Sequence, residues 1–280
     1  MNKKINDFQN KWDSIISSYD GDFRSDDDVD KFFSGEYYKA PNQNKELMDN
    51  ALPEPYLGDP YNNSIVCLNL NPGKYLEKIQ HPVDGIFVAK GNAIKSYSTF
   101  AKGFPYLQDK YKIDEKGKQN DGHKWWESRN KYFKRLFNYD GNKSPFALEI
   151  CPWRSSEFGR LKTNKEFKDY VKENIIDIAS EVSLNSDIKI VFSVGAPFRR
   201  IFERLKDRFK LIKELTQDNA EEHGYNFPVK EDGHLVNRRI SIWLDKEYEV
   251  YYLNTSAQGG NKNPAQNFDK IIQKLIAEHK

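Results

Sequence analysis

The feature that most constrains this chain is an uncharged run of β-forming residues that ends abruptly in a turn. Residues 64–70 read Ser-Ile-Val-Cys-Leu-Asn-Leu, and Asn71, Pro72 and Gly73 follow. A run of this kind predicts a strand buried on both faces of a parallel sheet. Proline cannot continue the hydrogen-bonded ladder, and glycine lets the backbone come close to a ligand. Ligands of such sheets bind beyond the carboxyl ends of the strands, so we expect Asn71 at the rim of a site, with an ordinary turn as the alternative.

Strand-like runs and amphipathic helices then alternate along the chain. The strand-like runs are 146–150, 188–194, 240–244 and 249–253, and the helical patterns are 125–137, 167–178, 199–213 and 264–275. This alternation predicts an α/β fold, a three-layer α/β/α sandwich with a mainly parallel central sheet. The turns after Leu70, Ile150, Val194 and Leu253 are then expected to gather at one edge of that sheet.

Composition divides the chain into two parts. Residues 1–50 are polar and charge-rich and are expected to form an N-terminal helical extension, in which the acidic run 26–28 caps a helix. Residues 51–280 are expected to form the α/β domain, with a polar insertion at 214–239. Prolines at short intervals in 52–60 predict an extended lead-in to the first strand.

The chain has a charge-rich but balanced composition. Its 44 Lys and Arg residues and 42 Asp and Glu residues give a formal net charge of +2, so a polyanion would bind through local patches. No apolar run is long enough to span a membrane, and the amino end lacks the apolar core of a signal peptide. Cys67 and Cys151 lie within apolar runs, which favours core positions over a disulfide. We therefore expect a monomeric, cytoplasmic protein without membrane contact.

Several common chemistries lack their signatures in this sequence. There is no Walker-type phosphate loop, no Gly-x-Gly-x-x-Gly after a strand and no Gly-x-Ser-x-Gly nucleophile turn. The five histidines are scattered, and neither cysteine has a neighbouring partner, so no metal and no cofactor is expected. The strand-end turns offer amides, hydroxyls and glycine backbone, which can orient a water, read a base edge and bind phosphate. The aromatic residues of 100–106 either stack on a base or, more commonly, plug their loop onto the core.

Five segments resemble the uracil-DNA glycosylase superfamily. Residues 68–73, Leu-Asn-Leu-Asn-Pro-Gly, look like the Gly-x-Asn-Pro-Gly turn after its first strand, particularly in the mismatch-specific branch. Residues 52–60 and 150–156 are similar to segments of poorly characterised members, and 191–196 resembles the third strand. Residues 253–256, Leu-Asn-Thr-Ser, occupy the place of the family's His-Pro-Ser loop, which grips DNA. The order of these motifs carries more weight than any one of them.

The resemblance implies a glycosylase-like fold and a monofunctional DNA glycosylase, which flips a nucleotide out of the duplex and hydrolyses the bond between base and deoxyribose. It implies catalytic roles for Asn71, which would position the attacking water, and for Asn254. The implied base pocket comprises Leu70, Phe104, Tyr106, Trp153 and Ser155. The implied DNA contacts are Gly73, Lys74, Arg154, Gly195, Ser256, Gln258, Gly259, Gly260, Asn261 and Lys262.

Three departures from the family pattern bear on the substrate. Asn69 replaces the first glycine of the turn, no water-activating Asp-Pro-Tyr follows it, and Asn254 stands where a histidine is expected. Losing that histidine removes a donor that stabilises the departing base anion. A modified base therefore fits better than uracil, and removal of modified phage bases in antiviral defence is one such role by analogy.

Two other classes of function stay open. A non-catalytic DNA-binding module on the same fold would bind DNA with a clear salt dependence and leave the glycosidic bond intact. A small-molecule hydrolase that uses the strand-end pocket would show no affinity for DNA.

Overall fold

The structure is a computed structural model of the whole chain. It describes residues 3–18, 23–24, 26–42, 47–48, 51–73, 96–109, 112, 120–155, 157–227, 239–256, 264 and 266–279.

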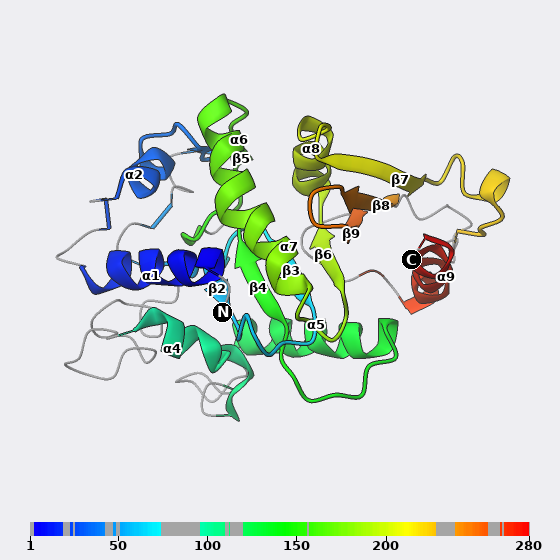
Figure 1. Cartoon of the computed structure of the whole chain (residues 1–280), viewed down its shortest axis with the longest axis horizontal. Coiled ribbons are helices and arrows are strands. Elements are labelled where there is room, and N and C mark those ends of the chain that lie inside the picture. The colour runs from blue at the N-terminus through cyan, green and yellow to red at the C-terminus, as the bar shows by residue number, and fades with distance from the viewer. Residues whose placement is uncertain are drawn as a thin grey trace.

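A seven-stranded mixed sheet forms the centre of the molecule (Figure 1), in the order β2-β4-β3-β6-β9-β8-β7. The strands are β2 (Tyr56–Leu57), β3 (Val66–Asn69), β4 (Phe146–Glu149), β6 (Ile190–Val194), β7 (Phe209–Leu215), β8 (Arg239–Asp245) and β9 (Val250–Ser256). The four middle strands, β4, β3, β6 and β9, are parallel to one another. The outer pairs, β2 with β4, β9 with β8 and β8 with β7, are antiparallel. β8 and β9 are joined by a tight turn, as antiparallel neighbours can be, and β2 and β7 are the edge strands. The predicted α/β class is confirmed, and the prediction of a mainly parallel sheet holds only for these four strands.

The helices are mostly those that the apolar spacing predicts. They are α1 (Lys3–Ser17), α2 (Asp27–Phe33), α4 (Tyr97–Lys102), α5 (Asp121–Leu136), α6 (Lys165–Val171), α7 (Asp177–Ser183), α8 (Ala196–Arg204) and α9 (Asp269–His279). A π-helical segment, η4 (Lys172–Ile176), joins α6 to α7, so the pattern at 167–178 is one continuous helical stretch. Short 3-10 turns, η2 (Pro105–Leu107), η5 (Glu221–His223) and η6 (Gln266–Phe268), and a small ladder of β1 (Tyr38–Lys39) with β5 (Arg160–Leu161) complete the described elements.

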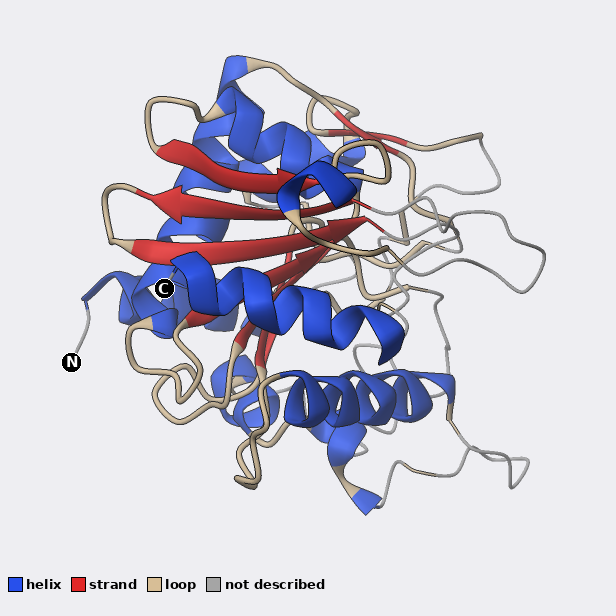
Figure 2. Ribbon diagram, turned by 90° about the vertical axis from the view of Figure 1, so that its right-hand side faces the viewer, coloured by secondary structure: helices blue, strands red, loops and turns tan. Residues whose placement is uncertain are grey.

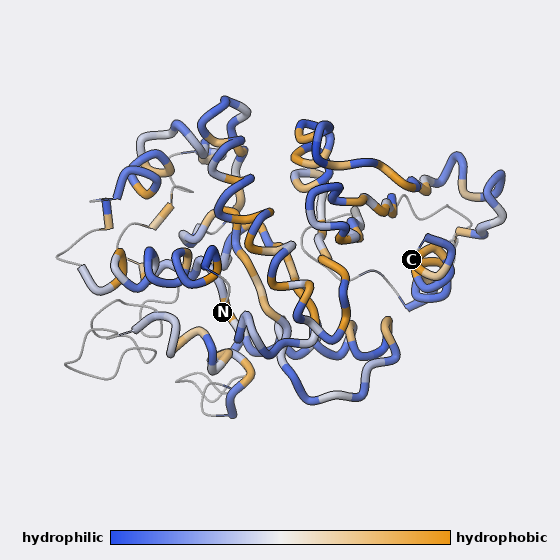
Figure 3. Tube along the Cα trace, viewed as in Figure 1, coloured by the Kyte–Doolittle hydropathy of each residue, from blue (hydrophilic) through white to orange (hydrophobic). Residues whose placement is uncertain are grey.

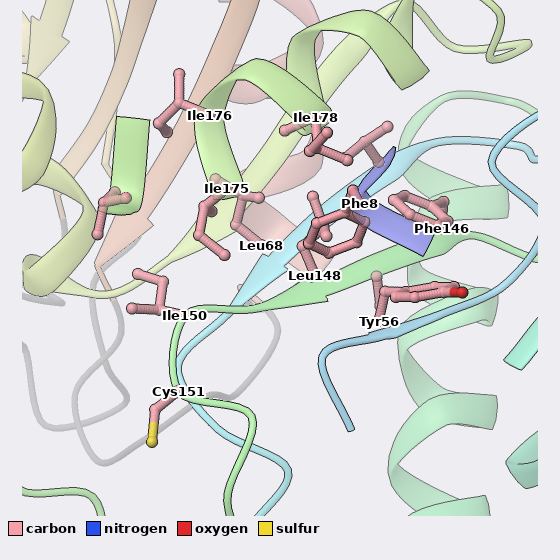
Figure 4. Packing of buried hydrophobic residues seen from close by; sticks show 14 of the residues in the cluster. Phe8, Tyr56, Leu68, Phe146, Leu148, Ile150, Cys151, Ile175, Ile176 and Ile178 are labelled. Atoms are coloured by element: carbon pink, nitrogen blue, oxygen red, sulfur yellow. The ribbon is translucent and has the colours of Figure 1, made fainter. Parts of the chain in front are cut away.

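Helices cover both faces of the sheet (Figure 2). Val66 and Leu68 of β3 belong to a buried cluster that includes Phe8 of α1 and Ile178 of α7, part of which is drawn in Figure 4. The alternate residue Cys67 belongs to a second cluster, with Tyr132 and Phe133 of α5 and Ile271, Ile272 and Leu275 of α9. Period-two alternation along β3 therefore separates the two helical layers. Figure 3 shows the apolar residues concentrated on the central strands and on the helices around them.

The prediction of one helix over the basic segment 199–213 is wrong. Helix α8 ends at Arg204, and Phe209 begins edge strand β7, which pairs with β8. The ring of Phe209 lies 4.7 Å from the ring of Phe202 and 5.0 Å from that of Tyr252. Strand pairing and this aromatic contact outweigh the helical spacing of the apolar residues. The predicted insertion 214–239 contains the end of β7 and η5, and residues 228–238 lie outside the described residues.

The N-terminal helices pack into the main core. Five apolar residues of α1, namely Ile5, Phe8, Trp12, Ile15 and Ile16, are buried in the same cluster as β3. The Asp26 side chain accepts hydrogen bonds from the backbone amides of Asp28 and Val29, so the predicted cap of α2 is confirmed. Cys67 and Cys151 are buried free thiols, as predicted.

Two absences concern the described residues alone. None of the described helices has the combination of length and apolarity needed to cross a bilayer. In the same part of the chain, no three His, Cys, Asp or Glu side chains converge as a metal site would require.

Candidate functional site at the carboxyl ends of β3 and β4

The turns that follow β3 and β4 are joined by backbone hydrogen bonds. The amides of Ile150 and Cys151 donate to the carbonyls of Asn69 and Leu70, each over 3.0 Å, and this extends the parallel ladder past the strand ends. Further along, the amide of Ser155 donates to the carbonyl of Gly73 over 3.1 Å. Two segments that are about 80 residues apart therefore form one surface at the carboxyl edge, as the sequence predicts.

Asn71 is half-buried at this edge, and its side-chain amide has a fixed direction. Its Nδ2 donates to Ser155 Oγ over 3.0 Å, and Ser155 Oγ donates to the Glu157 carbonyl over 3.0 Å. Because a hydroxyl has one proton, Ser155 can only accept from Asn71, and this identifies the atom facing Ser155 as Nδ2. Among the described residues, Asn71 Oδ1 accepts no hydrogen bond, so it is open to a ligand or a water.

Arg154, which the resemblance assigns to DNA contact, is instead buried beneath the turn with 2% exposure. Its Nη1 donates to the Pro72 carbonyl over 2.8 Å, and its Nη2 contacts both the Glu54 carboxylate and the Tyr106 hydroxyl. Tyr106 in turn donates to Glu54 Oε1 over 2.6 Å. This buried charge pair anchors the Asn-Pro-Gly turn from below, and Tyr106 belongs to the same network.

A second buried pair, Asn69 and Glu149, lies at the ends of β3 and β4, just before the turn that carries Asn71. Asn69 Nδ2 donates to Glu149 Oε1 over 3.0 Å, and the Cys67 thiol donates to Asn69 Oδ1 over 3.4 Å. Burial raises the pKa of Glu149 to about 8, although the Asn69 amide acts in the opposite direction. Sequence reasoning did not select Glu149; the available signal was a charged residue inside the otherwise apolar run 146–150.

Asn254, the second residue with an implied catalytic role, uses both of its amide hydrogens within the fold. Its Nδ2 donates to Ser193 Oγ over 3.0 Å and to the Gly195 carbonyl over 3.2 Å, and only 2% of the residue is exposed. Gly195 has φ +110° and ψ 158°, a conformation open essentially to glycine alone. Asn254 therefore holds the turn through which β6 enters α8.

Of the remaining base-pocket residues, two aromatic residues lie in the core and two residues lie beside Asn71. The ring of Phe104 is buried 4.8 Å from that of Trp126. Trp153 is fully buried, with its ring 5.9 Å from that of Trp12 and 5.1 Å from that of Phe33. Both aromatic residues thus plug their loops onto the core, whereas Leu70 and Ser155 lie beside Asn71.

The predicted DNA contacts are only partly described. Gly73, with φ +84°, and Gly195 lie in the turns after β3 and β6. Ser256 is the last residue of β9, and its side chain is not described. Lys74, Gln258, Gly259, Gly260, Asn261 and Lys262 lie outside the described residues.

Two surface grooves carry positive charge, and one has the larger excess. The groove beside α5 has a volume of about 510 Å³, and two of its three cations, Lys131 and Arg135, pair with Glu127 and Asp269, which leaves Lys124. The groove between α6 and α8 has a volume of about 300 Å³. It has an apolar floor that includes Phe167 and Ile201, and its cations are Lys162, Lys168 and Arg204. Within the described part of the chain, none of these three cations forms an ion pair, so they give this groove a net positive charge.

Taken together, the carboxyl edge presents an oriented neutral amide above two buried carboxyl groups. An amide oxygen can accept a hydrogen bond from water and so orient it, although it is too weak a base to remove the proton. This chemistry suits a substrate that supplies much of the driving force itself. The chain matches no protein-family model, no curated protein and no solved structure.

Proposed function

We propose that this chain is a monofunctional DNA glycosylase that hydrolyses the bond between a modified base and its deoxyribose. The observation that carries the proposal is the direction of the Asn71 amide, which Ser155 holds with Oδ1 free of any bond to the described residues. The resemblance of residues 68–73 to the glycosylase turn supports the same conclusion.

In this proposal Asn71 Oδ1 accepts a hydrogen bond from the attacking water and directs its oxygen toward C1′ of a flipped nucleotide. A nucleotide must leave the stack for this atom to be reached. The reacting sugar develops positive charge as the base departs, and the neutral amide imposes no competing negative charge on the DNA phosphates. Positioning of this kind accounts for several orders of magnitude in rate.

DNA would be held by turns and cations around the edge. The backbone of Gly73 and Gly195 and the loop 254–263 are proposed to contact phosphates, as the resemblance implies. The cations of the α6–α8 groove, Lys162, Lys168 and Arg204, supply an additional phosphate-binding surface. We further propose that the protein acts as a monomer in the cytoplasm.

A modified base is the preferred substrate because Asn254 does not replace the missing histidine as a donor. Its amide hydrogens are engaged by Ser193 and Gly195, so they stabilise the fold and not a departing base. Removal of modified bases from phage DNA is the biological role that we propose by analogy.

The test is base release from a panel of duplexes that contain uracil, a thymine mismatch, hypoxanthine and glucosylated hydroxymethylcytosine. Abasic sites are revealed by alkaline cleavage, and released bases are identified by mass spectrometry. The proposal predicts release of a modified base and little release of uracil. DNA binding without release of any base would contradict it.

One observation favours a second candidate, a non-catalytic DNA-binding module. The two carboxyl groups beneath the turn, Glu54 and Glu149, are both buried, so neither can act on a water at the surface. Such a module would bind DNA with a salt-dependent affinity and leave every glycosidic bond intact. The panel separates the two candidates by turnover alone.

A further inference from the structure

A row of four residues in register, three of them polar, crosses the four parallel strands just behind Asn71. Asn69 lies opposite Glu149, and Val194 lies opposite Thr255. Leu68 is opposite Ser193, so Asn69 is opposite Val194. Asn69, Glu149 and Val194 are the last residues of their strands, and Thr255 is the last but one of β9. Asn69 shares its face of the sheet with Cys67, whose side chain packs in the α5 cluster. The row therefore lies on the α5 side of the sheet.

Two side-chain atoms of this row are buried without a partner. Within the described residues, neither Glu149 Oε2 nor Thr255 Oγ1 forms a hydrogen bond. Glu149 is only 4% exposed, and its other oxygen already accepts from Asn69. Buried polar atoms of native proteins are nearly always bonded, and each exception calls for a physical reason, such as a catalytic role. Glu149 Oε2 is such an exception at the edge where the proposed substrate would bind.

Burial favours the neutral form of Glu149 at neutral pH. Burial is the largest cause of its raised pKa, about 8, and the Glu54 carboxylate adds to the rise. The Asn69 amide, Arg154 and Arg129 act in the opposite direction without reversing it. The thiols of Cys67 and Cys151 are neutral as well, because burial raises the pKa of each. With Oε1 accepting from Asn69, the acid proton belongs on Oε2.

We propose that Glu149 is the acid that protonates the departing base, and that the base is a 4-aminopyrimidine, a derivative of cytosine. The inference rests on the proposed glycosylase function and deepens it. Asn71 lies two residues beyond Asn69, at the bend that ends β3, and two residues of chain span at most about 7 Å. A flipped pyrimidine placed between Asn71 and Glu149 turns its glycosidic bond toward Asn71 and its far edge toward Glu149.

The chemistry of that edge selects the base. Ring nitrogen N3 of a 4-aminopyrimidine has a lone pair and accepts the proton of Glu149, whereas N3 of a 4-oxopyrimidine such as uracil already carries a hydrogen. A 4-aminopyrimidine is also the poorer leaving group as an anion, so it has the greater need of an acid. Glu149 supplies the donor that Asn254 does not.

In the proposed step the C1′–N1 bond breaks, and its electron pair stays with the base. Glu149 Oε2 gives its proton to N3, so the base leaves as a neutral molecule and Glu149 becomes a carboxylate. The water oriented by Asn71 adds to C1′ through its oxygen and releases one proton to solvent, from which Glu149 is reprotonated. The net reaction consumes one water and yields a free base and an abasic deoxyribose.

The first test is the single-turnover release of glucosylated hydroxymethylcytosine by E149Q as a function of pH. Glutamine keeps the shape and the acceptor for Asn69 but has no acid proton. We expect the rate at neutral pH to fall by about 100-fold or more, the scale of a lost general acid. Because only the protonated acid acts, the wild-type rate should fall as pH rises through about 8, and E149Q should lack that limb.

A matched control is E181Q, which alters another buried glutamate whose Oε2 has no partner among the described residues, on α7. It should keep the wild-type rate and pH profile. Wild-type turnover in E149Q, or an unchanged alkaline limb, would overturn the assignment of Glu149. A similar loss in E181Q would do so as well, since it would show a general effect of buried carboxyl removal.

The second test does not depend on turnover. Duplexes that carry a 2′-fluoroarabino nucleotide resist glycosidic cleavage, so binding of the 4-amino and 4-oxo pyrimidine forms can be compared directly. Wild type should bind the 4-amino form more tightly, by roughly tenfold for one discriminating hydrogen bond, and E149Q, whose side-chain NH2 still donates at that position, should keep the preference although it loses turnover. Equal affinities in wild type would overturn the inference. Failure of the proposed function is a distinct result, namely no base released from any DNA.

Discussion

At the scale of single residues, the site depends on hydrogen bonds that fix the direction of an amide. The sequence points to Asn71 and to Ser155 but not to the bond between them, because nothing in a strand-end turn shows which residue of another turn it will meet. Glu149 escapes sequence reasoning for the same reason. Its partner Asn69 is 80 positions away, and an acidic residue in an apolar run has no meaning until that partner is known.

The direction of the Asn71 amide leads to a prediction for Ser155→Ala. The substitution removes the acceptor for Nδ2, so the amide is free to rotate and Oδ1 spends less time aimed at the water. We expect single-turnover base release to fall by roughly tenfold, with DNA affinity unchanged. Ser155→Thr, which restores a hydroxyl, should recover most of the rate. Equal losses in both variants would point to packing and would contradict the positioning role.

At the scale of elements, the sequence predicts the strands and helices whose buried residues form a recognisable apolar pattern. β3, β4, β6, α5 and α9 each carry an apolar run or a helical spacing that is visible in the sequence. The segment 199–213 is mispredicted because part of it becomes an edge strand, and pairing with β8 is a tertiary fact. The roles of Phe104 and Trp153 follow the same rule, since their rings lie in the core and the sequence of a loop does not show which residues its aromatics will contact.

A buried ionic cluster near the start of β9, at the edge of the sheet opposite Asn71, connects β8, α7 and the residue before β7. It leads to a prediction at the scale of elements. Arg208, just before β7, binds Asp245 of β8 with two hydrogen bonds of 3.0 and 2.8 Å and also contacts Asp177 of α7. All three residues are buried. Arg208→Ala would leave the buried Asp245 carboxylate without its cation, whereas Asp177 would keep Lys4 at 3.1 Å. Breaking a buried pair in this way costs about 3–5 kcal/mol of unfolding free energy.

Urea denaturation of Arg208→Ala measures that cost. Arg199→Ala is the matched control, because Arg199 forms an exposed pair with Glu203 on α8 that contributes little. Similar midpoints for the two variants would show that the buried cluster is not a major source of stability.

At the scale of the whole molecule, a net charge of +2 leaves DNA binding to local surfaces. The cations Lys162, Lys168 and Arg204 of the α6–α8 groove form no ion pair among the described residues, which makes this groove the clearest such surface. Their triple replacement by glutamine should weaken binding to any duplex. It should also lower the slope of log affinity against log salt by about one for each phosphate that these side chains neutralise in the wild type.

The control for that experiment replaces three exposed lysines elsewhere, Lys3, Lys246 and Lys270, by glutamine. It changes the net charge equally, so a general electrostatic effect would appear in both proteins. A slope that falls by the same amount in the control would exclude the groove as a specific DNA contact.

The central claim is that Asn71 orients the attacking water, and Asn71→Ala tests it most directly. Melting temperature, DNA affinity and single-turnover base release are measured on one preparation of wild type and of the variant. The claim predicts near-normal folding and affinity, with a rate lower by about two orders of magnitude or more. If Asn71 only closes the turn, stability drops by about 1 kcal/mol, the worth of one hydrogen bond, and activity follows the folded fraction. A destabilised variant with wild-type activity per folded molecule would contradict the claim.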